Sequence, residues 1–369
     1  MTAFGTFFLP GPTEVRPDVL AAMTRAMIGH RGADFEAVYR EVADGLRRVF
    51  RTSQPVLIAT ASATGLMEAG VRGLPEGRVL AIVNGAFSER FARIAEACGR
   101  PVTVLRVPDG QVATADDLRD ALRRDRFAGV TVVHSETSTG ALTDLESLGA
   151  VARAHGVPLV VDSVTGLAGA PLECDAWGLP FVLTGSQKAL ALPPGLAFAV
   201  AQPAFLAAAA QVPGRGLYLD VVEMAAFAAK GQTPNTPAIS LFFAAQVQLR
   251  HLLAEGIEAR WARHAAMADR TAAWAAGAET RTGVALQVVA PPGNRSPTVT
   301  ALRVPKGTDP AAVVAGAKAR GFVIGGGYGA LKGETFRIGH MGDHTRDGLE
   351  GCLEAVDDAL RDVGRRRPG

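Results

Sequence analysis

The sequence predicts an α/β fold followed by a smaller α+β domain. Between Val56 and Gln202, seven short apolar runs alternate with amphipathic segments such as Thr114–Arg124 and Leu145–His155. Continuous apolar runs are typical of strands buried on both faces of a mainly parallel sheet, so this alternation predicts helices on both faces. The chain has 369 residues, of which 48% are hydrophobic and 20% charged, and about 150 residues per domain suggests two or three domains.

A helix precedes the first strand, because apolar residues recur at three- and four-residue spacing from Phe35 to Phe50 and form one stripe. The seven expected strands of the large sheet then follow at Val56–Thr60, Val79–Asn84, Val102–Val107, Val130–His134, Leu159–Val161, Phe181–Thr184 and Leu196–Ala201.

The pattern changes after Pro237. From Ile239 to about Ala276 the chain contains no proline and one glycine, Gly256, which predicts long helices. The remaining expected elements are strands at Val284–Val289, Thr298–Val304, Phe322–Ile324 and Thr335–Ile338, and helices near Pro310–Ala319 and Leu349–Val363. We therefore expect residues 1–240 to form an N-terminal arm and a large domain, residues 241–276 to form linking helices, and residues 277–369 to form a small C-terminal domain.

Composition disfavours several classes of protein. The 38 Lys and Arg residues nearly balance the 36 Asp and Glu residues, and the only basic run is Arg365–Arg367, so nucleic acid is not an expected partner. The three cysteines lie far apart, with neither a disulfide framework nor a zinc-type spacing. The N-terminus does not read as a signal peptide, and no apolar stretch is long enough to span a bilayer. We expect a cytoplasmic protein with no membrane partner.

Polar residues at the ends of apolar strands are the candidate site. They occur at Thr60–Gly65, His134–Gly140, Val161–Ser163 and Thr184–Lys188, and the carboxyl ends of strands form the ligand crevice of open α/β sheets. Asp162 follows three apolar residues and should be desolvated, so it needs a cation or hydrogen-bond donors. A desolvated Lys188 loses its proton readily and becomes a nucleophile. This pair suits pyridoxal phosphate, and a purely structural ion pair is an equal alternative.

The loop Ala61–Gly65 enters a helix near Leu66. Small and hydroxyl residues there can form an anion site through backbone N–H groups, although an ordinary helix cap by Ser62 or Thr64 is the simpler reading. Neither a Walker lysine nor a GxGxxG motif is present, which disfavours nucleotide binding.

Taken together, these residues resemble the class V aminotransferases of the pyridoxal phosphate fold type I superfamily, in particular the alanine/serine–glyoxylate and serine–pyruvate branch. The 26-residue step from Asp162 to Lys188 also matches. The resemblance implies a large domain with a seven-stranded, mainly parallel sheet and a small C-terminal α+β domain. The matching segments are LPGPT (9–13), HSETSTG (134–140), VDSV (161–164), GSQKAL (185–190), YLD (218–220), TPNTPAISL (233–241) and FRIGHMG (336–342).

The resemblance implies a role for each matching residue. Lys188 would form the Schiff base with the cofactor and move the proton, and Asp162 would pair with the ring nitrogen. Phe87 would stack on the ring, where the family often has Trp, and Val164 would pack on the opposite face. The remaining cofactor contacts implied are Thr64 and Gly65 in the phosphate loop, Gln187 beside it, Thr137 at the cofactor or substrate, and Thr233, Asn235 and Thr236 reaching the neighbouring subunit of a homodimer.

Arg337 ends an apolar strand and could hold a substrate α-carboxylate with two parallel hydrogen bonds; a surface ion pair is the alternative. His30 and Arg31 resemble a His-Arg pair of phosphoserine aminotransferases, with His340 as a further candidate, but Arg31 could equally pair with Asp34 and we favour that structural role. His134 lacks a second ligand at metal spacing, so a structural or cofactor-side hydrogen bond is expected.

The implied reaction transfers an amino group from alanine or serine to glyoxylate or pyruvate. Phosphoserine transamination is the first alternative, and a pyridoxal phosphate lyase is the second. Cys174 and Cys352 do not match the position of a desulfurase cysteine, so the resemblance argues against sulfur transfer.

Overall fold

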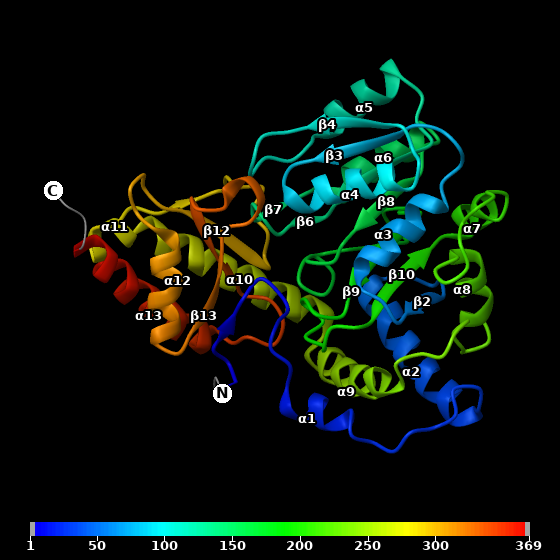
Figure 1. The fold of residues 1–369 in the computed structure, drawn as a ribbon, viewed down its shortest axis with the longest axis horizontal. Coiled ribbons are helices and arrows are strands. Elements are labelled where there is room, and N and C mark those ends of the chain that lie inside the picture. Colours follow the sequence, from blue (N-terminus) through cyan, green and yellow to red (C-terminus); the bar gives the residue numbers. More distant parts are fainter. Residues whose placement is uncertain (1–3, 366–369) are drawn as a thin grey trace.

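The computed structural model describes residues 4–365. Two α/β units lie side by side, with a larger one built on a seven-stranded sheet and a smaller one built on a five-stranded sheet (Figure 1). Helix α9 (Ile239–Glu255) packs against α1 (Pro17–Ala22) and α2 (Ala33–Phe50) of the larger unit. Helix α10 (Ile257–Ala276) continues into the smaller unit, where it contacts β12 (Val299–Arg303) and α13 (Arg346–Arg365).

The large sheet confirms all seven strands expected from the sequence, with each boundary within one residue of its expected place. Its spatial order is β2-β10-β9-β8-β5-β3-β4, and every neighbouring pair is parallel except the two that involve β10. The strands are β2 (Val56–Ala59), β3 (Val79–Val83), β4 (Val102–Arg106), β5 (Gly129–Val133), β8 (Leu159–Asp162), β9 (Phe181–Gly185) and β10 (Ala197–Ala201).

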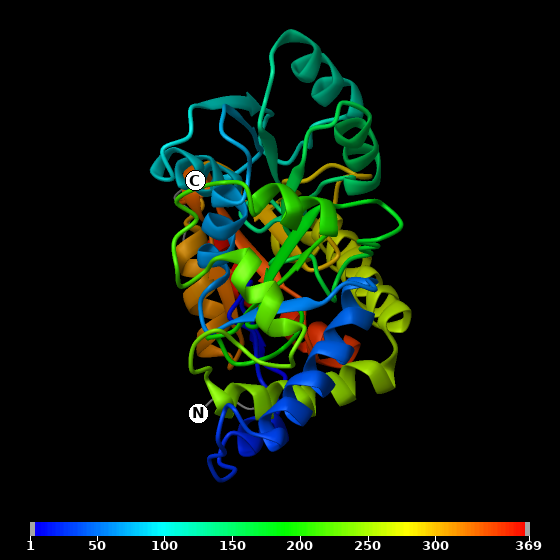
Figure 2. The same cartoon turned by 90° about the vertical axis from the view of Figure 1, so that its right-hand side faces the viewer.

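Helices cover both faces of this sheet, as the sequence predicts (Figure 2). Alternate side chains of the strands enter two separate apolar cores: Ile58 and Val182 pack with α2, α6 and α9, whereas Leu57 and Leu183 pack with α3 and α8. The helices of this unit are α1 (Pro17–Ala22), α2 (Ala33–Phe50), α3 (Ala63–Arg72), α4 (Ala86–Ala97), α5 (Ala115–Arg124), α6 (Leu145–Ala154), α7 (Pro203–Ala209) and α8 (Val221–Ala228), and a short hairpin joins β6 (Ser135–Glu136) to β7 (Ala141–Leu142).

The small sheet has the order β1-β13-β14-β12-β11, and its first strand comes from the other end of the chain. Strand β1 (Phe7–Phe8) runs parallel to β13, with Phe8 opposite Ile324, and the Phe8 ring stacks on His344 inside the small core. No strand was expected there. The other elements are α11 (Ala278–Thr282), β11 (Gln287–Val288), β12 (Val299–Arg303), α12 (Pro310–Ala319), β13 (Val323–Gly326), η1 (Gly329–Leu331), β14 (Thr335–Gly339) and α13 (Arg346–Arg365).

The strand expected at Val284–Val289 is reduced to the two residues of β11, which pair only with β12 at the edge of the small sheet. The other three expected strands and both expected helices of this unit are present. The domain boundaries expected at residues 240 and 277 stay predictions.

Candidate active site

A cavity of about 410 Å³ lies between the two units, at the carboxyl ends of the large-sheet strands. Asp162 is the last residue of β8, and Lys188 follows β9 by three residues. Three parts of the chain therefore line one space: the strand ends, the N-terminal segment Leu9–Pro12, and the small-unit residues Gly325, Gly326, Tyr328 and Arg337.

Lys188 is buried in this cavity, with 8% of its surface exposed. Its Nζ donates a hydrogen bond to the backbone carbonyl oxygen of Pro10. Burial and, to a smaller extent, the positive charge of Arg337 lower the pKa of Lys188 to about 8, and the charge of Asp162 opposes both effects. The amine can therefore lose its proton near neutral pH, as a nucleophile or proton carrier requires.

Asp162 is also buried, and one oxygen of its carboxylate accepts a hydrogen bond of 2.8 Å from the Val164 N–H. Burial raises the pKa of this carboxyl to about 7, whereas the Val164 N–H lowers it. Among the described residues no ion pair joins Asp162 to Lys188, whose amine bonds to Pro10 instead. The structure thus does not support the purely structural ion pair, and it leaves the Asp162 carboxylate able to accept a further donor.

The segment Pro10–Thr13 crosses the site and is fixed to the residues around Lys188. The N–H of Thr13 donates to the Gln187 carbonyl, and its hydroxyl donates to the Lys188 carbonyl, both at 3.0 Å. Gly11 has a φ of +99°, and a Cβ on it would overlap the Lys188 side chain. Only glycine combines this backbone conformation with so close an approach to the lysine.

Phe87 and Val164 both line the cavity, as expected of residues that flank a cofactor ring. Phe87 lies in the first turn of α4 and also stacks on Tyr328, with ring centroids 5.3 Å apart. Its turn is held by the fully buried Glu136, whose carboxylate accepts hydrogen bonds from the N–H groups of Phe87, Ser88 and Ser138. A carboxylate at a helix N-terminus is stabilised by the helix dipole, so Glu136 fixes where α4 begins.

The first turn of α3 also faces the cavity, through Ala63 and Thr64. Ser62 stands at the N-cap position but makes no capping hydrogen bond, contrary to the simple helix-cap reading of this loop. Free N–H groups at a helix N-terminus form a site for an anion such as a phosphate. Gly65 does not line the cavity: its N–H donates to the Ser62 carbonyl, and a Cβ there would clash with Leu219. Gly65 is therefore a packing position rather than a direct contact of the cavity.

Arg337 enters the cavity from β14. Its Nε donates to the Gly326 carbonyl at 2.8 Å, and one terminal nitrogen donates to the Thr137 carbonyl at 3.2 Å. No carboxylate pairs with it among residues 4–365, so the alternative of a surface ion pair is not found. Burial lowers the pKa of this arginine, an effect that the charge of Glu136 opposes. Thr137 and Gln187 line the same cavity, and the Thr137 hydroxyl bonds to that of Thr165 at 2.6 Å.

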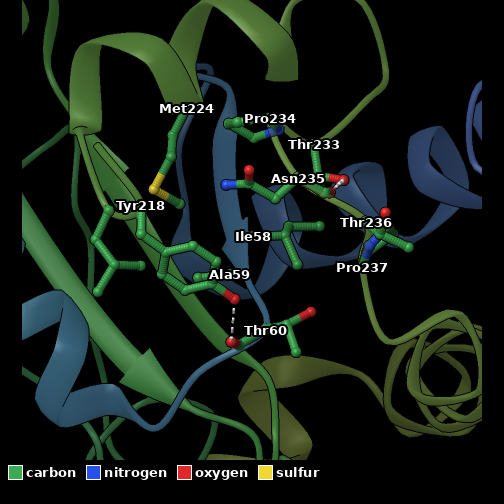
Figure 3. Close-up of a pocket in the computed structure, with 11 residues that line it drawn as sticks. Ile58, Ala59, Thr60, Tyr218, Met224, Thr233, Pro234, Asn235, Thr236 and Pro237 are labelled. Carbon is green, nitrogen blue, oxygen red and sulfur yellow. Dashed lines mark hydrogen bonds between the residues drawn. The ribbon is translucent and has the colours of Figure 1, made fainter.

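Thr233, Asn235 and Thr236 lie elsewhere, around a small hollow beside β2 (Figure 3). Tyr218 closes one side of this hollow, and its hydroxyl donates to the Thr60 carbonyl at 3.0 Å. None of the three residues lines the cavity of Lys188 in the same chain. Tyr218 and Leu217 next to it expose 53% and 77% of their surfaces, so two large hydrophobic side chains are open to solvent here.

Arg31 is tied to this same loop, which corrects two expectations. Its guanidinium donates to the carbonyls of Thr233 and Pro234, at 2.6 and 2.7 Å, rather than pairing with Asp34. Neither Arg31 nor His30 lines the cavity of its own chain, so neither contacts substrate there. The carbonyls of a tight loop offer better-placed acceptors than the carboxylate three residues along the chain, which the sequence spacing alone could not reveal.

The histidines at the other candidate positions make hydrogen bonds within the protein core. His134 is buried and shares a hydrogen bond of 2.9 Å between its Nδ1 and the Ser163 hydroxyl. His340 is buried away from the cavity, and its Nε2 bonds to the Thr300 hydroxyl at 2.9 Å. Burial lowers the pKa of His134 to about 4 and that of His340 to about 3, so both rings are neutral at physiological pH and His340 is no anion partner.

Three residues of the site were missed by the sequence analysis. Glu136 lay inside a matching segment, where an acidic residue following an apolar strand was a signal of a buried carboxylate. Tyr328 and Arg90 had no such signal, because a tyrosine and an arginine in polar segments are ordinarily solvent-exposed. They reach the cavity only because β13 and α4 face each other across it.

Comparison with known proteins gives consistent results. The aminotransferase class-V family matches residues 10–321. A relative from Synechococcus sp. (strain PCC 6716), described as the small subunit of a soluble hydrogenase, is 35% identical over 96% of this chain and 93% of its own. The L-aspartate–glyoxylate aminotransferase of Paracoccus denitrificans is 32% identical over 99% of this chain and 93% of its own. The structure of alanine–glyoxylate aminotransferase from Nostoc sp. aligns with a TM-score of 0.89 at 31% identity, covering 96% of this chain and 95% of that one.

A mainly parallel seven-stranded sheet with a small second α/β unit defines this protein as a fold type I pyridoxal phosphate enzyme. More specifically, the chain belongs to the class V aminotransferase family and is an aminotransferase that depends on pyridoxal phosphate. The predicted fold class, family and cofactor are thereby confirmed. Within residues 4–365, no helix combines the length and hydropathy needed to cross a bilayer.

Proposed function

We propose that this enzyme transfers the amino group of a small L-amino acid, alanine or serine, to glyoxylate or pyruvate. The observation that carries the proposal is the cavity in which Lys188, Asp162 and Arg337 meet, because Arg337 there has no carboxylate partner among the described residues. An arginine held in place by two backbone carbonyls can offer its outer N–H groups to the carboxylate of an amino acid or a 2-oxo acid. The alanine- and aspartate-dependent glyoxylate aminotransferases among the relatives support glyoxylate as the acceptor.

The residues present fit pyridoxal phosphate. The N-terminal turn of α3, with its unused N–H groups beside Thr64, would receive the phosphate, and Phe87 and Val164 would hold the two faces of the ring. The carboxylate of Asp162 has a single hydrogen bond and can accept another from a protonated ring nitrogen, whose charge would favour the ionised form of Asp162. When bound, pyridoxal phosphate supplies a carbonyl carbon for amino-group exchange and a ring that accepts electrons released at the substrate Cα.

Lys188 would then act at its Nζ. Burial keeps the pKa of this amine near 8, so it can take a proton from the substrate Cα and return it at neutral pH. Arg337 fixes the substrate carboxylate and hence the direction of the Cα–H bond. The Pro10–Thr13 segment covers the lysine and helps to exclude water.

We also propose a homodimer in which Thr233, Asn235 and Thr236 serve the site of the partner subunit. Support comes from the separation of these residues from their own cavity and from the exposed Leu217 and Tyr218 beside them. Sedimentation should show a dimer, and a fully active monomer would reject this arrangement. The cytoplasmic location expected from the sequence stays a proposal, which fractionation of producing cells would test.

The function is tested with a panel of donors (alanine, serine, aspartate and phosphoserine) against glyoxylate and pyruvate. We expect alanine or serine with glyoxylate to give the highest kcat/KM. With serine alone, a transaminase forms one hydroxypyruvate per active site and then stops, whereas a lyase eliminates water from serine and continues to release pyruvate and ammonia. Continued product formation without an acceptor, or no reaction with any donor, would contradict the proposal.

A further inference from the structure

Arg90 is a second arginine in the cavity whose charge is not used by the site described so far. It stands in the second turn of α4, three residues after Phe87, and its guanidinium lies 5.0 Å from the centroid of the Phe87 ring. One terminal nitrogen donates to the Tyr328 hydroxyl at 2.9 Å. Within the described chain no carboxylate pairs with Arg90, whereas nearby Arg106 forms an ion pair with Glu89.

The charges that line the cavity are unbalanced. Arg90, Lys188 and Arg337 supply three cationic groups, and Asp162 supplies the only carboxylate among the lining residues. The charge of Arg90 reaches the reacting groups, because it lowers the pKa of both Asp162 and Lys188 after the larger effect of burial. Guanidinium groups that border a partly dehydrated cavity and have no paired carboxylate favour an anionic ligand.

Tyr328 contacts both arginines of the cavity. Arg90 donates to its hydroxyl, and the guanidinium of Arg337 lies 5.6 Å from the centroid of its ring. Arg90 and Arg337 therefore contact the same tyrosine, one at its hydroxyl and the other over its ring, and both line one cavity. A molecule with a carboxylate at each end would have one arginine for each.

Resting on the proposed function, we propose that Arg90 binds the side-chain carboxylate of a dicarboxylic amino acid while Arg337 binds its α-carboxylate. The enzyme then accepts aspartate or glutamate as further donors beside alanine and serine, and Arg90 sets how well it uses them relative to alanine. Tyr328 positions Arg90 through the hydrogen bond to its hydroxyl.

The test measures kcat/KM for aspartate, glutamate and alanine, each with glyoxylate, in the wild type and in Arg90→Gln. Loss of a charge-assisted hydrogen bond should lower the aspartate-to-alanine ratio by about 10- to 100-fold, with partial recovery in Arg90→Lys. Tyr328→Phe should lower the ratio by about threefold, because Arg90 loses one neutral hydrogen bond that holds it. Arg93→Gln is the matched control, since Arg93 lies one turn further along α4 and lines only the adjoining outer cavity.

A binding measurement separates this inference from the proposed function. Calorimetry with succinate and with propionate on the cofactor-loaded protein should show that Arg90→Gln weakens succinate alone, and that Arg337→Gln weakens both. If the wild type transaminates no donor, the proposed function fails, and the succinate result still decides the role of Arg90.

Three outcomes would overturn the inference while leaving the proposed function intact. Equal loss with aspartate and alanine would assign Arg90 a structural role on the Phe87 ring. Loss of pyridoxal phosphate retention without a change in the ratio would assign it to the cofactor phosphate. A wild-type preference for phosphoserine that Arg90→Gln abolishes would identify a phosphate as the anion.

Discussion

The two walls of the cavity are built in different ways. Asp162 and Lys188 extend from adjacent parallel strands at the centre of the large sheet, where Asp162 lies opposite Leu183 in register. The opposite wall comes from the two ends of the chain, residues 9–12 and 325–337, and meets the first through a few hydrogen bonds to backbone carbonyls. We name the first the rigid wall, because it belongs to the hydrogen-bonded strands of the large sheet, and the second the mobile wall, because it comes from the small unit and residues 9–12.

The largest expected effect concerns the rigid wall. Lys188→Ala should lower kcat by about 10⁴-fold or more, because both the nucleophile and the proton carrier are removed. The variant should still bind pyridoxal phosphate, through Asp162 and the first turn of α3, which equilibrium dialysis would measure. Near-native transamination by this variant would contradict the assignment of the whole cavity.

Gly11→Ala tests how tightly the mobile wall is bound to the rigid one. The left-handed backbone at Gly11 should cost about 1–2 kcal/mol of unfolding free energy once a Cβ is present. The displaced Lys188 should in addition lower kcat by about 10²-fold. Gly5→Ala is a matched control, because Gly5 has a φ of +95° but no neighbour within 4 Å of an added Cβ. Equal kcat values for the two variants would show that the contact between Gly11 and Lys188 is unimportant.

The protonation of the Lys188 amine as a function of pH tests how strongly burial in the rigid wall perturbs its pKa. Its pKa is lowered to about 8, from an ordinary value near 10.4, so its amine becomes neutral as the pH rises through 8. Reductive methylation of cofactor-free protein, followed by mass spectrometry, should show labelling of Lys188 rising with a midpoint near pH 8. The exposed Lys332 serves as an internal control in the same digest. A midpoint near 10 for Lys188 would mean that burial does not perturb the amine.

The smallest expected effect lies outside both walls. Arg31→Ala removes two hydrogen bonds to the loop of Thr233 and Pro234 and should weaken cofactor retention by about fivefold, given the exposed setting of Arg31. Dialysis at fixed protein concentration measures the effect, and Arg47→Ala, which removes an exposed ion pair with Asp44, is the control. A loss confined to phosphoserine turnover would instead indicate that Arg31 binds the substrate.

The rigid wall was predictable from sequence because its geometry is local. A run of buried β residues ending in Asp162 or leading to Lys188 places each side chain at a known edge of the sheet. Thr64, Thr137 and Gln187 lie in segments that the same rule selects, Val164 came from the match to the family, and all four line the cavity. For Arg337, the end of an apolar strand suggested a residue of the site, and the match to the family segment supported a role in substrate binding.

The mobile wall was only partly predictable, because long-range pairing decides it. Nothing in the sequence around Phe7 indicates a partner more than 300 residues away, and the approach of Arg90 to Tyr328 depends on that packing. For Gly65, the sequence did not reveal a packing constraint from Leu219, which lies on a distant loop, and the expected phosphate contact stays a prediction. Likewise, Arg31 satisfies its guanidinium on a loop 200 residues away.

Strand β1 gives the molecule a mechanical link. Phe8 is embedded in the core of the small unit, and Pro10, two residues later, accepts the hydrogen bond from Lys188. These two residues are too close along the chain for either end to move independently. The position of the Pro10 carbonyl at the lysine is therefore set by the small sheet as well as by the large one, although Lys188 itself belongs to the large unit.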